Sequence, residues 1–122
     1  MDNTGYKKLI LYKKAKVLVL LVYKTTSSFP KTETYSLVSQ MRRSAVSILA
    51  NTVEGYSKDS SAEYARFLTI AIGSLTELEV YIDLSLELNF INQEQHDRIM
   101  SLLMEVKTLL YGSRKAVRAR IQ

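Results

Sequence analysis

Cysteine and tryptophan are absent from this 122-residue sequence, and proline and histidine each occur once. Without cysteine, disulfides, thiolate nucleophiles and cysteine-ligated zinc sites are excluded. One proline and four glycines disfavour a turn-rich all-β domain and fit a few long helices. The length predicts one domain with one core.

Long apolar runs are also missing. The longest one, residues 17–23, has seven residues, whereas a helix that spans a bilayer needs about 20. Lys13, Lys14 and Lys16 precede this run closely and no small-residue cleavage site follows it, so it does not resemble a secretory signal. We expect a soluble, cytoplasmic protein without a membrane partner.

Positive charge gathers at the two ends of the sequence. The net charge is +6 over residues 1–31, −4 over residues 32–90 and +3 over residues 91–122. This asymmetry predicts an anionic partner such as RNA or DNA, a neighbouring subunit of opposite charge, or both. The candidate nucleic-acid contacts are Lys7, Lys8, Lys13, Lys14, Arg114, Lys115, Arg118 and Arg120.

Three tyrosines lie near these cations in the sequence, namely Tyr6, Tyr12 and Tyr111. Tyrosine rings can stack on bases, but at the end of a bundle they more often pack against other side chains. Both roles stay open at this point.

The spacing of apolar residues predicts four helices, over about residues 6–26, 33–54, 60–89 and 92–120. Pro30 blocks continuation of the first helix. Gly73, inside the third, predicts that another backbone or a bulky side chain approaches closely there. Long helices joined by short loops predict an all-α, antiparallel, up-down-up-down four-helix bundle.

The helix ends carry recognisable capping residues. Gly55 is placed to be the left-handed C-cap of the second helix. Ser60 with Glu63, and Asn92 with Gln95, are placed to form capping boxes at the starts of the third and fourth helices. The polar residues between the second and third helices are therefore explained by chain reversal rather than by an active site.

Residues suited to catalysis are few. His96 is the single histidine and takes part in no Glu-x-x-His or His-Glu-x-x-His pattern. Glu77, Glu79 and Asp83 share one helix, and the second helix offers only Glu54 as a facing carboxylate. We expect no enzyme, no metal and no cofactor, with a carboxylate-bound metal enzyme as the weaker alternative.

Two stretches, residues 29–55 with QMRRSAVSI and residues 61–79 with RFLTIAIGSL, resemble a known family. With them, nearly the whole chain resembles the bacterial four-helix-bundle proteins encoded in intervening sequences of 23S ribosomal RNA genes. The resemblance implies a bundle that assembles as a homopentameric ring. It extends to the accessory variability determinant of diversity-generating retroelements, a basic pentamer that binds a reverse transcriptase and nucleic acid.

Several polar residues belong to the motif that carries the resemblance, and we assign them structural roles. They are Arg42, Arg43, Asn51, Glu54, Gly55, Ser60 and Glu63. We expect Arg43 to pair with Glu54 and Asn51 to bond the carbonyls that follow Gly55, because buried polar groups need partners.

A ring would also bring two different faces of neighbouring copies together. The acidic row Glu79, Asp83, Glu87 could then pair with Lys13, Lys16 and Lys24 of the next copy. Five copies of a +5 chain would carry +25, a charge that favours salt-dependent binding of phosphates. The sequence thus predicts a non-enzymatic, oligomeric nucleic-acid-binding bundle, and a protein-binding scaffold stays the alternative.

Overall fold

A computed structural model describes residues 4–121 of the chain. Its elements, in chain order, are the 3-10 helix η1 (Gly5–Lys8), α1 (Ile10–Thr26), the 3-10 helix η2 (Lys31–Glu33), α2 (Leu37–Tyr56), α3 (Ser61–Glu87) and α4 (Gln93–Arg118). No strand occurs among these residues. The prediction of an all-α protein with four long helices is confirmed.

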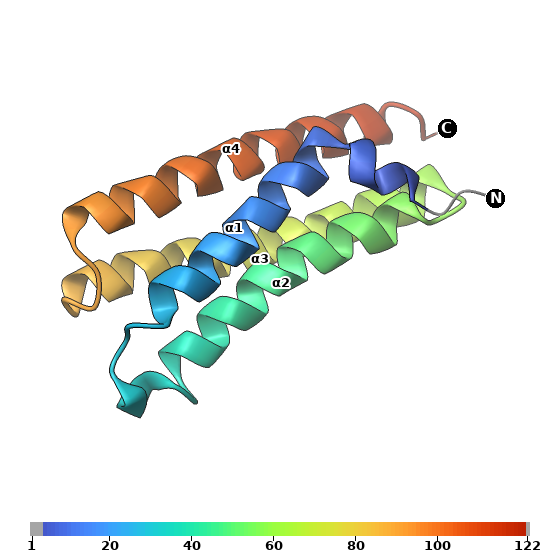
Figure 1. The fold of residues 1–122 in the computed structure, drawn as a ribbon. Coiled ribbons are helices and arrows are strands. Elements are labelled where there is room, and N and C mark those ends of the chain that lie inside the picture. Colours follow the sequence, from blue (N-terminus) through green and yellow to red (C-terminus); the bar gives the residue numbers. More distant parts are fainter. Residues whose placement is uncertain (1–3, 122) are drawn as a thin grey trace.

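The four long helices pack around one core. Each helix contacts the next one along the chain, and α1 also contacts α4. Figure 1 shows that both ends of the chain lie at the same end of the molecule, so the start of α1 and the end of α4 are neighbours. This arrangement brings the two basic ends of the sequence together.

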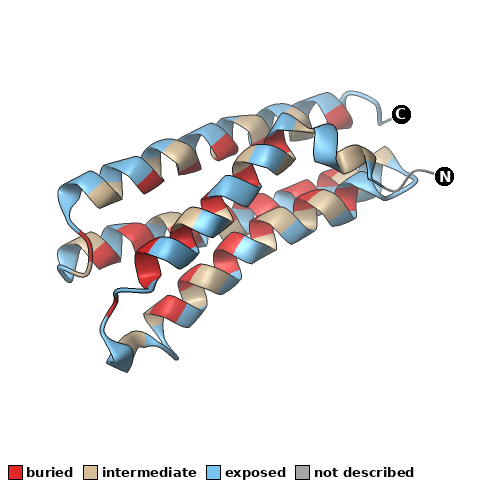
Figure 2. Ribbon diagram, in the orientation of Figure 1, coloured by how far each residue is buried: buried red, intermediate tan, exposed pale blue. Residues whose placement is uncertain are grey.

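Every long helix buries one side, and Figure 2 shows these buried sides turned inward. Leu18, Ile48, Leu75 and Leu103, one from each helix, are at most 1% exposed. Burying such a side chain stabilises the fold by about 1.5–3 kcal/mol. The apolar spacing located the core correctly in α2, α3 and α4. In α1 it did not, because Ile10, Val17 and Leu20, which carried the spacing, are exposed.

Two helices begin later than the sequence suggests. The first was expected from residue 6, but Leu9 has an extended backbone (ψ 132°) that separates η1 from α1. The second was expected from residue 33, but Ser36 is non-helical (φ −123°, ψ −100°), so α2 begins at Leu37. Apolar periodicity does not locate such local breaks, because it is read over a window of several turns.

The prediction that Gly55 ends a helix in the left-handed conformation is wrong. Among the described residues no glycine has a positive φ, and α2 continues through Gly55 to Tyr56. A Cβ on Gly55 would lie 2.8 Å from Cβ of Phe67 and 3.0 Å from Cδ1 of Tyr64. Gly55 is therefore small because α3 crosses α2 closely at this point.

Asn89 adopts the left-handed conformation that was expected of Gly55. It follows α3 with φ 63°, while the Phe90 and Asn89 amides donate to the carbonyls of Ser85 (2.9 Å) and Leu86 (3.0 Å). These two bonds form a Schellman motif, which ends the helix.

One predicted capping box is complete and the other is half formed. Asn92 and Gln95 exchange both bonds at the start of α4, at 2.8 and 2.9 Å. At the start of α3, Ser60 accepts from the Glu63 amide (3.1 Å), but the Glu63 carboxylate pairs with Arg66 (3.2 Å). A nearby cation thus replaces the cap's own N–H as the partner of that carboxylate.

The close approach predicted at Gly73 is absent. A Cβ built there would meet no atom within 4 Å outside its own neighbourhood. Gly73 is exposed on α3, so packing among the described residues does not explain this glycine.

Candidate nucleic-acid interface

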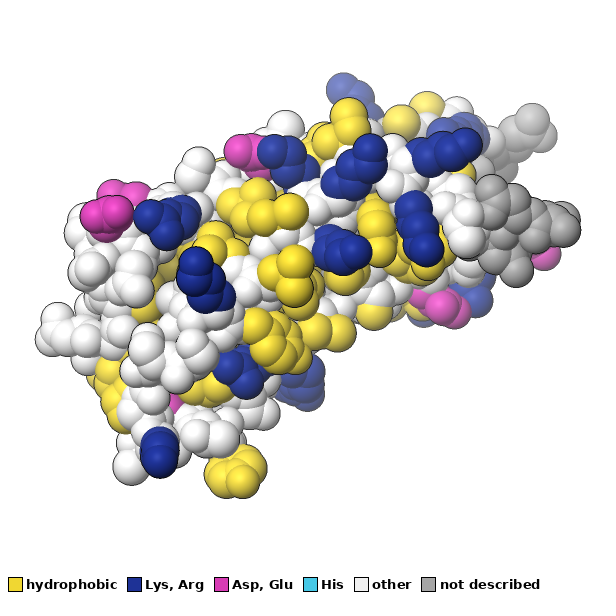
Figure 3. All heavy atoms as spheres, viewed as in Figure 1, with side chains coloured by type: hydrophobic (Ala, Val, Ile, Leu, Met, Phe, Trp, Pro, Cys, Tyr) yellow, Lys and Arg dark blue, Asp and Glu magenta, His cyan; other side chains and the backbone are white. Residues whose placement is uncertain are grey.

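The predicted basic residues come from both ends of the sequence and gather at one end of the molecule. Lys7 and Lys8 lie on η1, Lys13 follows on the first turns of α1, and Arg118 closes α4. Gly5 of η1 lies against Tyr56 at the end of α2, and Figure 1 shows η1 and the end of α4 at the same end of the molecule. In Figure 3, Lys and Arg side chains are spread over the face that contains α1 and α4, with few acidic ones among them.

Two of the eight predicted cations have structural partners. Lys14 Nζ lies 2.9 Å from Glu105 Oε2 and ties α1 to α4. Arg114 donates to Thr69 Oγ1 (3.2 Å), which ties α4 to α3, and its guanidinium lies 5.0 Å from the centre of the Tyr111 ring. These two side chains hold the interface together and are the weakest candidates for phosphate contacts.

The other six cations are exposed, and none has a side-chain hydrogen bond or ion pair to another residue in the range 4–121. They are Lys7, Lys8, Lys13, Lys115, Arg118 and Arg120. We call this set the basic end. Six exposed ammonium and guanidinium groups that are not neutralised by carboxylates suit contacts to phosphates.

Acidic residues at the same end are largely paired. In the segment that joins α2 to α3, Glu54 pairs with Lys58 (3.1 Å) and Glu63 pairs with Arg66 (3.2 Å). Their negative charge is therefore offset locally, and the basic end keeps its positive potential.

Tyrosines near the basic end mostly pack. Tyr6 and Tyr12 meet edge to face at 5.1 Å, and Tyr56 and Tyr64 do so at 6.0 Å. Burial raises the pKa of Tyr64. The packing role that was left open for Tyr6 and Tyr12 is the one that the structure gives them.

Two predicted bonds of the motif residues are wrong. Arg43 does not pair with Glu54; it donates to Gln40 Oε1 (2.7 Å), one turn earlier on α2. Asn51 does not reach the carbonyls after Gly55, because its amide donates to the Ser47 carbonyl (2.8 Å) and hydroxyl (3.0 Å). In both cases a partner about one turn earlier on α2 is taken instead of the expected one further along the chain.

Arg42 has a structural role, as expected. Its Nε donates to Thr26 Oγ1 (3.0 Å), its Nη2 donates to the Tyr23 carbonyl (3.3 Å), and its guanidinium lies 4.6 Å from the Tyr23 ring centre. Arg42 thereby joins the start of α2 to the end of α1.

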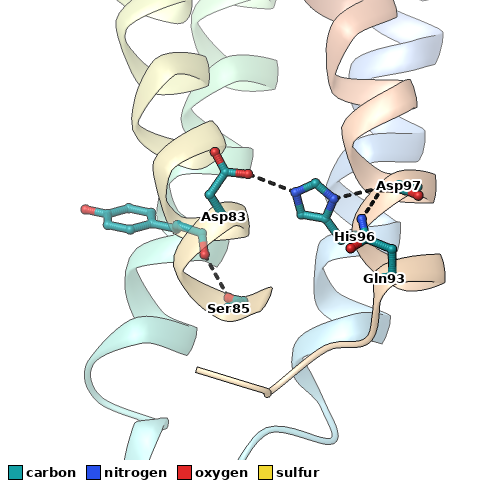
Figure 4. Close-up of polar contacts among 6 residues, drawn as sticks. Asp83, Ser85, Gln93, His96 and Asp97 are labelled. Atoms are coloured by element: carbon teal, nitrogen blue, oxygen red, sulfur yellow. Dashed lines mark hydrogen bonds and ion pairs between the residues drawn. The ribbon is translucent and has the colours of Figure 1, made fainter. Parts of the chain in front are cut away.

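The single histidine links α3 to α4 (Figure 4). His96 Nε2 lies 2.8 Å from Asp83 Oδ1, and Nδ1 lies 3.0 Å from Asp97 Oδ1. The hydrogen bonds to Asp83 and to Asp97 raise the pKa of His96, and the bond to His96 lowers the pKa of Asp97. The charged imidazolium suits this site because both ring nitrogens face carboxylates.

Two acids of the row predicted to meet a neighbouring copy are already engaged within the chain. Asp83 contacts His96, and Glu79 lies 3.7 Å from Lys107 of α4. Glu87 alone has no ion pair with another described residue.

The apolar spacing that predicted the first helix forms an exposed stripe along α1. Ile10, Val17 and Leu20 are 63%, 51% and 61% exposed, and Lys13 and Lys24 share their side of the helix. The spacing of residues 10, 13, 17, 20 and 24 repeats every seven residues, as in a helix-pairing seam. The spacing alone did not show that this side of the helix is exposed, because α1 buries a second apolar side against the core.

Residues 4–121 contain neither a cluster of metal ligands nor a helix that could span a membrane. Among residues 4–121, no group of three or more His, Asp or Glu side chains is arranged to hold a metal ion. None of the helices described combines the length and the apolar character needed to cross a bilayer.

Comparisons with known proteins give a consistent assignment. The model of the 23S rRNA-intervening sequence protein family matches residues 7–112. The fold is similar to the crystal structure of a protein of unknown function of the S23 ribosomal protein family from Bacteroides thetaiotaomicron. The TM-score is 0.79 at 25% identity, over 87% of this chain and 99% of that one. No curated protein matches. The chain belongs to the 23S rRNA-intervening sequence protein family.

Proposed function

We propose that this protein is a non-enzymatic nucleic-acid-binding bundle that contacts RNA or DNA through the basic end. The observation that carries the proposal is the meeting of unpaired cations from η1, α1 and α4 at one end of the molecule. Family membership supports a small helical protein, and the charge distribution favours a polyanionic partner.

Binding at such a surface depends on salt in a predictable way. Each phosphate that a lysine or arginine neutralises releases counterions, so log affinity falls linearly with log salt. The slope measures the number of phosphate contacts, at about 0.9 per contact for duplex DNA and about 0.7 for single strands. Cations without carboxylate partners contribute most, because they break no ion pair on binding.

The test is fluorescence anisotropy of a labelled RNA duplex titrated with the protein at several salt concentrations. We expect measurable affinity at low salt and a steep loss as salt rises. Affinity that is absent at low salt, or that does not change with salt, would contradict the proposal. An acidic polypeptide of similar charge tests the alternative of a protein-binding scaffold, which would prefer it to the duplex.

We also propose that the chain is an antiparallel, up-down-up-down bundle that self-assembles as a homopentamer. The exposed apolar stripe of α1 supports assembly, because exposed apolar patches mark surfaces on which another protein packs. The lysines beside the stripe favour an acidic surface on the neighbouring copy. A second stripe on α3 fits it: Val80, Leu84 and Leu88 are exposed, and Glu77 and Glu87 lie on the same side of the helix. Two different stripes on one chain suit a head-to-tail contact, which makes a ring when the rotation between neighbouring copies closes.

Light scattering of purified protein tests the assembly. Leu20→Glu places a charge in the α1 stripe and should shift the mass towards the monomer, because the charge would be buried at the contact. Thr108→Glu, at an exposed position of α4 outside both stripes, is the control and should leave the mass unchanged. A monomeric wild type at micromolar concentration would contradict the ring.

Contact with a reverse transcriptase stays a prediction from the resemblance.

A further inference from the structure

A hollow of about 460 Å³ lies where the end of α1 meets the start of α2, far from the basic end. We propose that this hollow binds an unstacked base of single-stranded nucleic acid together with its flanking phosphates. The inference rests on the proposed nucleic-acid function and adds a second contact, with a preference for single strands. We call this hollow the stacking site.

Aromatic rings provide the surface for the base. Tyr35 is 95% exposed and Tyr23 is 41% exposed, and both line the hollow. An almost fully exposed tyrosine ring makes few contacts within the chain and is free to stack. Val38 and Val46 also line the hollow and complete an apolar surface. Bases stack on such rings whatever their identity, because each base presents a π-face.

Arginines provide the positive charge. The Arg42 guanidinium already lies against the Tyr23 ring and is held there by Thr26, so its position is fixed before a ligand arrives. Arg43 is exposed at the rim. A guanidinium can stack on a base or donate two parallel hydrogen bonds to a phosphate.

The rest of the lining also suits a polyanion. Thr34 and Ser39 place two hydroxyls at the rim, and no acidic side chain of the described residues lines the hollow. Residues 23–46 contain Lys24, Lys31, Arg42 and Arg43 against a single acid, a local net charge of +3. That acid, Glu33, accepts from the Ser36 hydroxyl at 3.0 Å.

The neighbouring hollow between α2 and α3 serves as a contrast. It is smaller, about 250 Å³, and Glu77 lines it together with Arg43. The Glu77 carboxylate accepts from the Tyr81 hydroxyl (3.0 Å) and would repel a phosphate. Of these two neighbouring hollows, only the stacking site combines aromatic rings and arginines with a lining free of carboxylates.

Binding of a labelled single-stranded oligouridylate tests the inference, with oligothymidylate as a second arm that distinguishes RNA from DNA. Uridine and thymidine strands are used because they stack weakly on themselves. We expect Tyr35→Ala to weaken single-strand affinity by about five- to 150-fold, the range found when a stacking ring is removed. Tyr35→Phe keeps the ring and should retain wild-type affinity. Affinity for an RNA duplex should not change in either variant.

Crosslinking locates the contact directly. An oligonucleotide that carries 4-thiouridine should crosslink, after irradiation, to the tryptic peptide of residues 32–42, in which Tyr35 is the only aromatic residue. Crosslinks confined to peptides of η1 or α4 would overturn the inference.

The outcomes separate the two proposals. Equal single-strand affinity for wild type and Tyr35→Ala overturns the stacking site and leaves the basic end untouched. Failure of the wild type itself to bind either single strands or the duplex overturns both. A change in oligomeric mass for Tyr35→Ala with unchanged affinity shows that another copy covers the ring, which also overturns the inference.

Discussion

His96 Nε2 lies 2.8 Å from Asp83 Oδ1, so the only histidine of the chain joins the end of α3 to the start of α4. Its other ring nitrogen faces Asp97 at 3.0 Å. A neutral imidazole can donate from one nitrogen only, whereas the imidazolium donates from both. The contact is therefore strongest when the ring is charged.

This geometry predicts a pH dependence of stability. The pKa of His96 is raised by its bonds to Asp83 and Asp97, so the folded state holds the proton more tightly than the unfolded state. The stabilisation is fully present below the unfolded histidine pKa of about 6.5 and is lost as pH rises through the raised folded pKa. Urea denaturation should show that His96→Gln destabilises more at about pH 5.5 than at about pH 9.

A double-mutant cycle assigns the effect to the pair. In an Asp83→Asn background the pH dependence of the His96→Gln effect should shrink, because the carboxylate that favours the charged ring has been removed. A loss of stability that is equal at both pH values in the original background would contradict the imidazolium assignment.

Gly55 and Gly73 should respond to alanine in opposite directions. At Gly55 the new Cβ would lie 2.8 Å from Phe67 Cβ and 3.2 Å from the Tyr64 carbonyl oxygen, so α2 and α3 must separate. We expect Gly55→Ala to destabilise the fold by about 1–3 kcal/mol, the usual cost of overpacking.

Gly73→Ala is the matched case with open space around the new methyl group. It should stabilise the helix by up to about 1 kcal/mol, because alanine loses less backbone entropy than glycine. Free energies of unfolding from urea titrations measure both variants. If Gly55→Ala also stabilised the chain, the close crossing of α2 and α3 would be wrong.

Ser44 should be more stable as alanine. Its side chain is buried, 3% exposed, and its hydroxyl has no hydrogen-bond partner among the described residues. Removing a buried unsatisfied hydroxyl is expected to raise the free energy of unfolding by about 1 kcal/mol. Ser85→Ala is the control: its hydroxyl donates to the Tyr81 carbonyl at 2.8 Å, so its loss should destabilise. Equal losses of stability in Ser44→Ala and Ser85→Ala would show that the Ser44 hydroxyl has a hydrogen-bond partner.

The four helices could be predicted from sequence because apolar residues recur at helical spacing. The same spacing marked the core in α2, α3 and α4 but an exposed side in α1, because α1 carries apolar residues on two sides. The Asn92–Gln95 capping box could be predicted because its partners are three residues apart. Gly55 was misjudged because a glycine at a helix end also fits a close crossing, and only the position of Phe67 on another helix distinguishes the two.

The basic end and the stacking site also differ in how much of each the sequence could predict. Charge segregation predicted the basic end, but it could not show that Lys14 is paired with Glu105 or that Arg114 bonds Thr69. Those partners are 91 and 45 residues away along the chain. The stacking site was missed because Tyr23 and Tyr35 belong to different segments, and only folding brings them to one hollow.

The salt dependence of RNA duplex affinity, compared between two charge-matched double variants, tests the account most directly. Lys115→Ala with Arg118→Ala removes two cations from the basic end, and Arg98→Ala with Lys107→Ala removes two from elsewhere on α4. We predict that the first pair weakens binding and lowers the salt slope by about one for each phosphate that is no longer neutralised, while the second pair leaves the slope nearly unchanged. Equal effects of the two pairs would show that the affinity follows net charge alone, and would contradict a defined interface at the basic end.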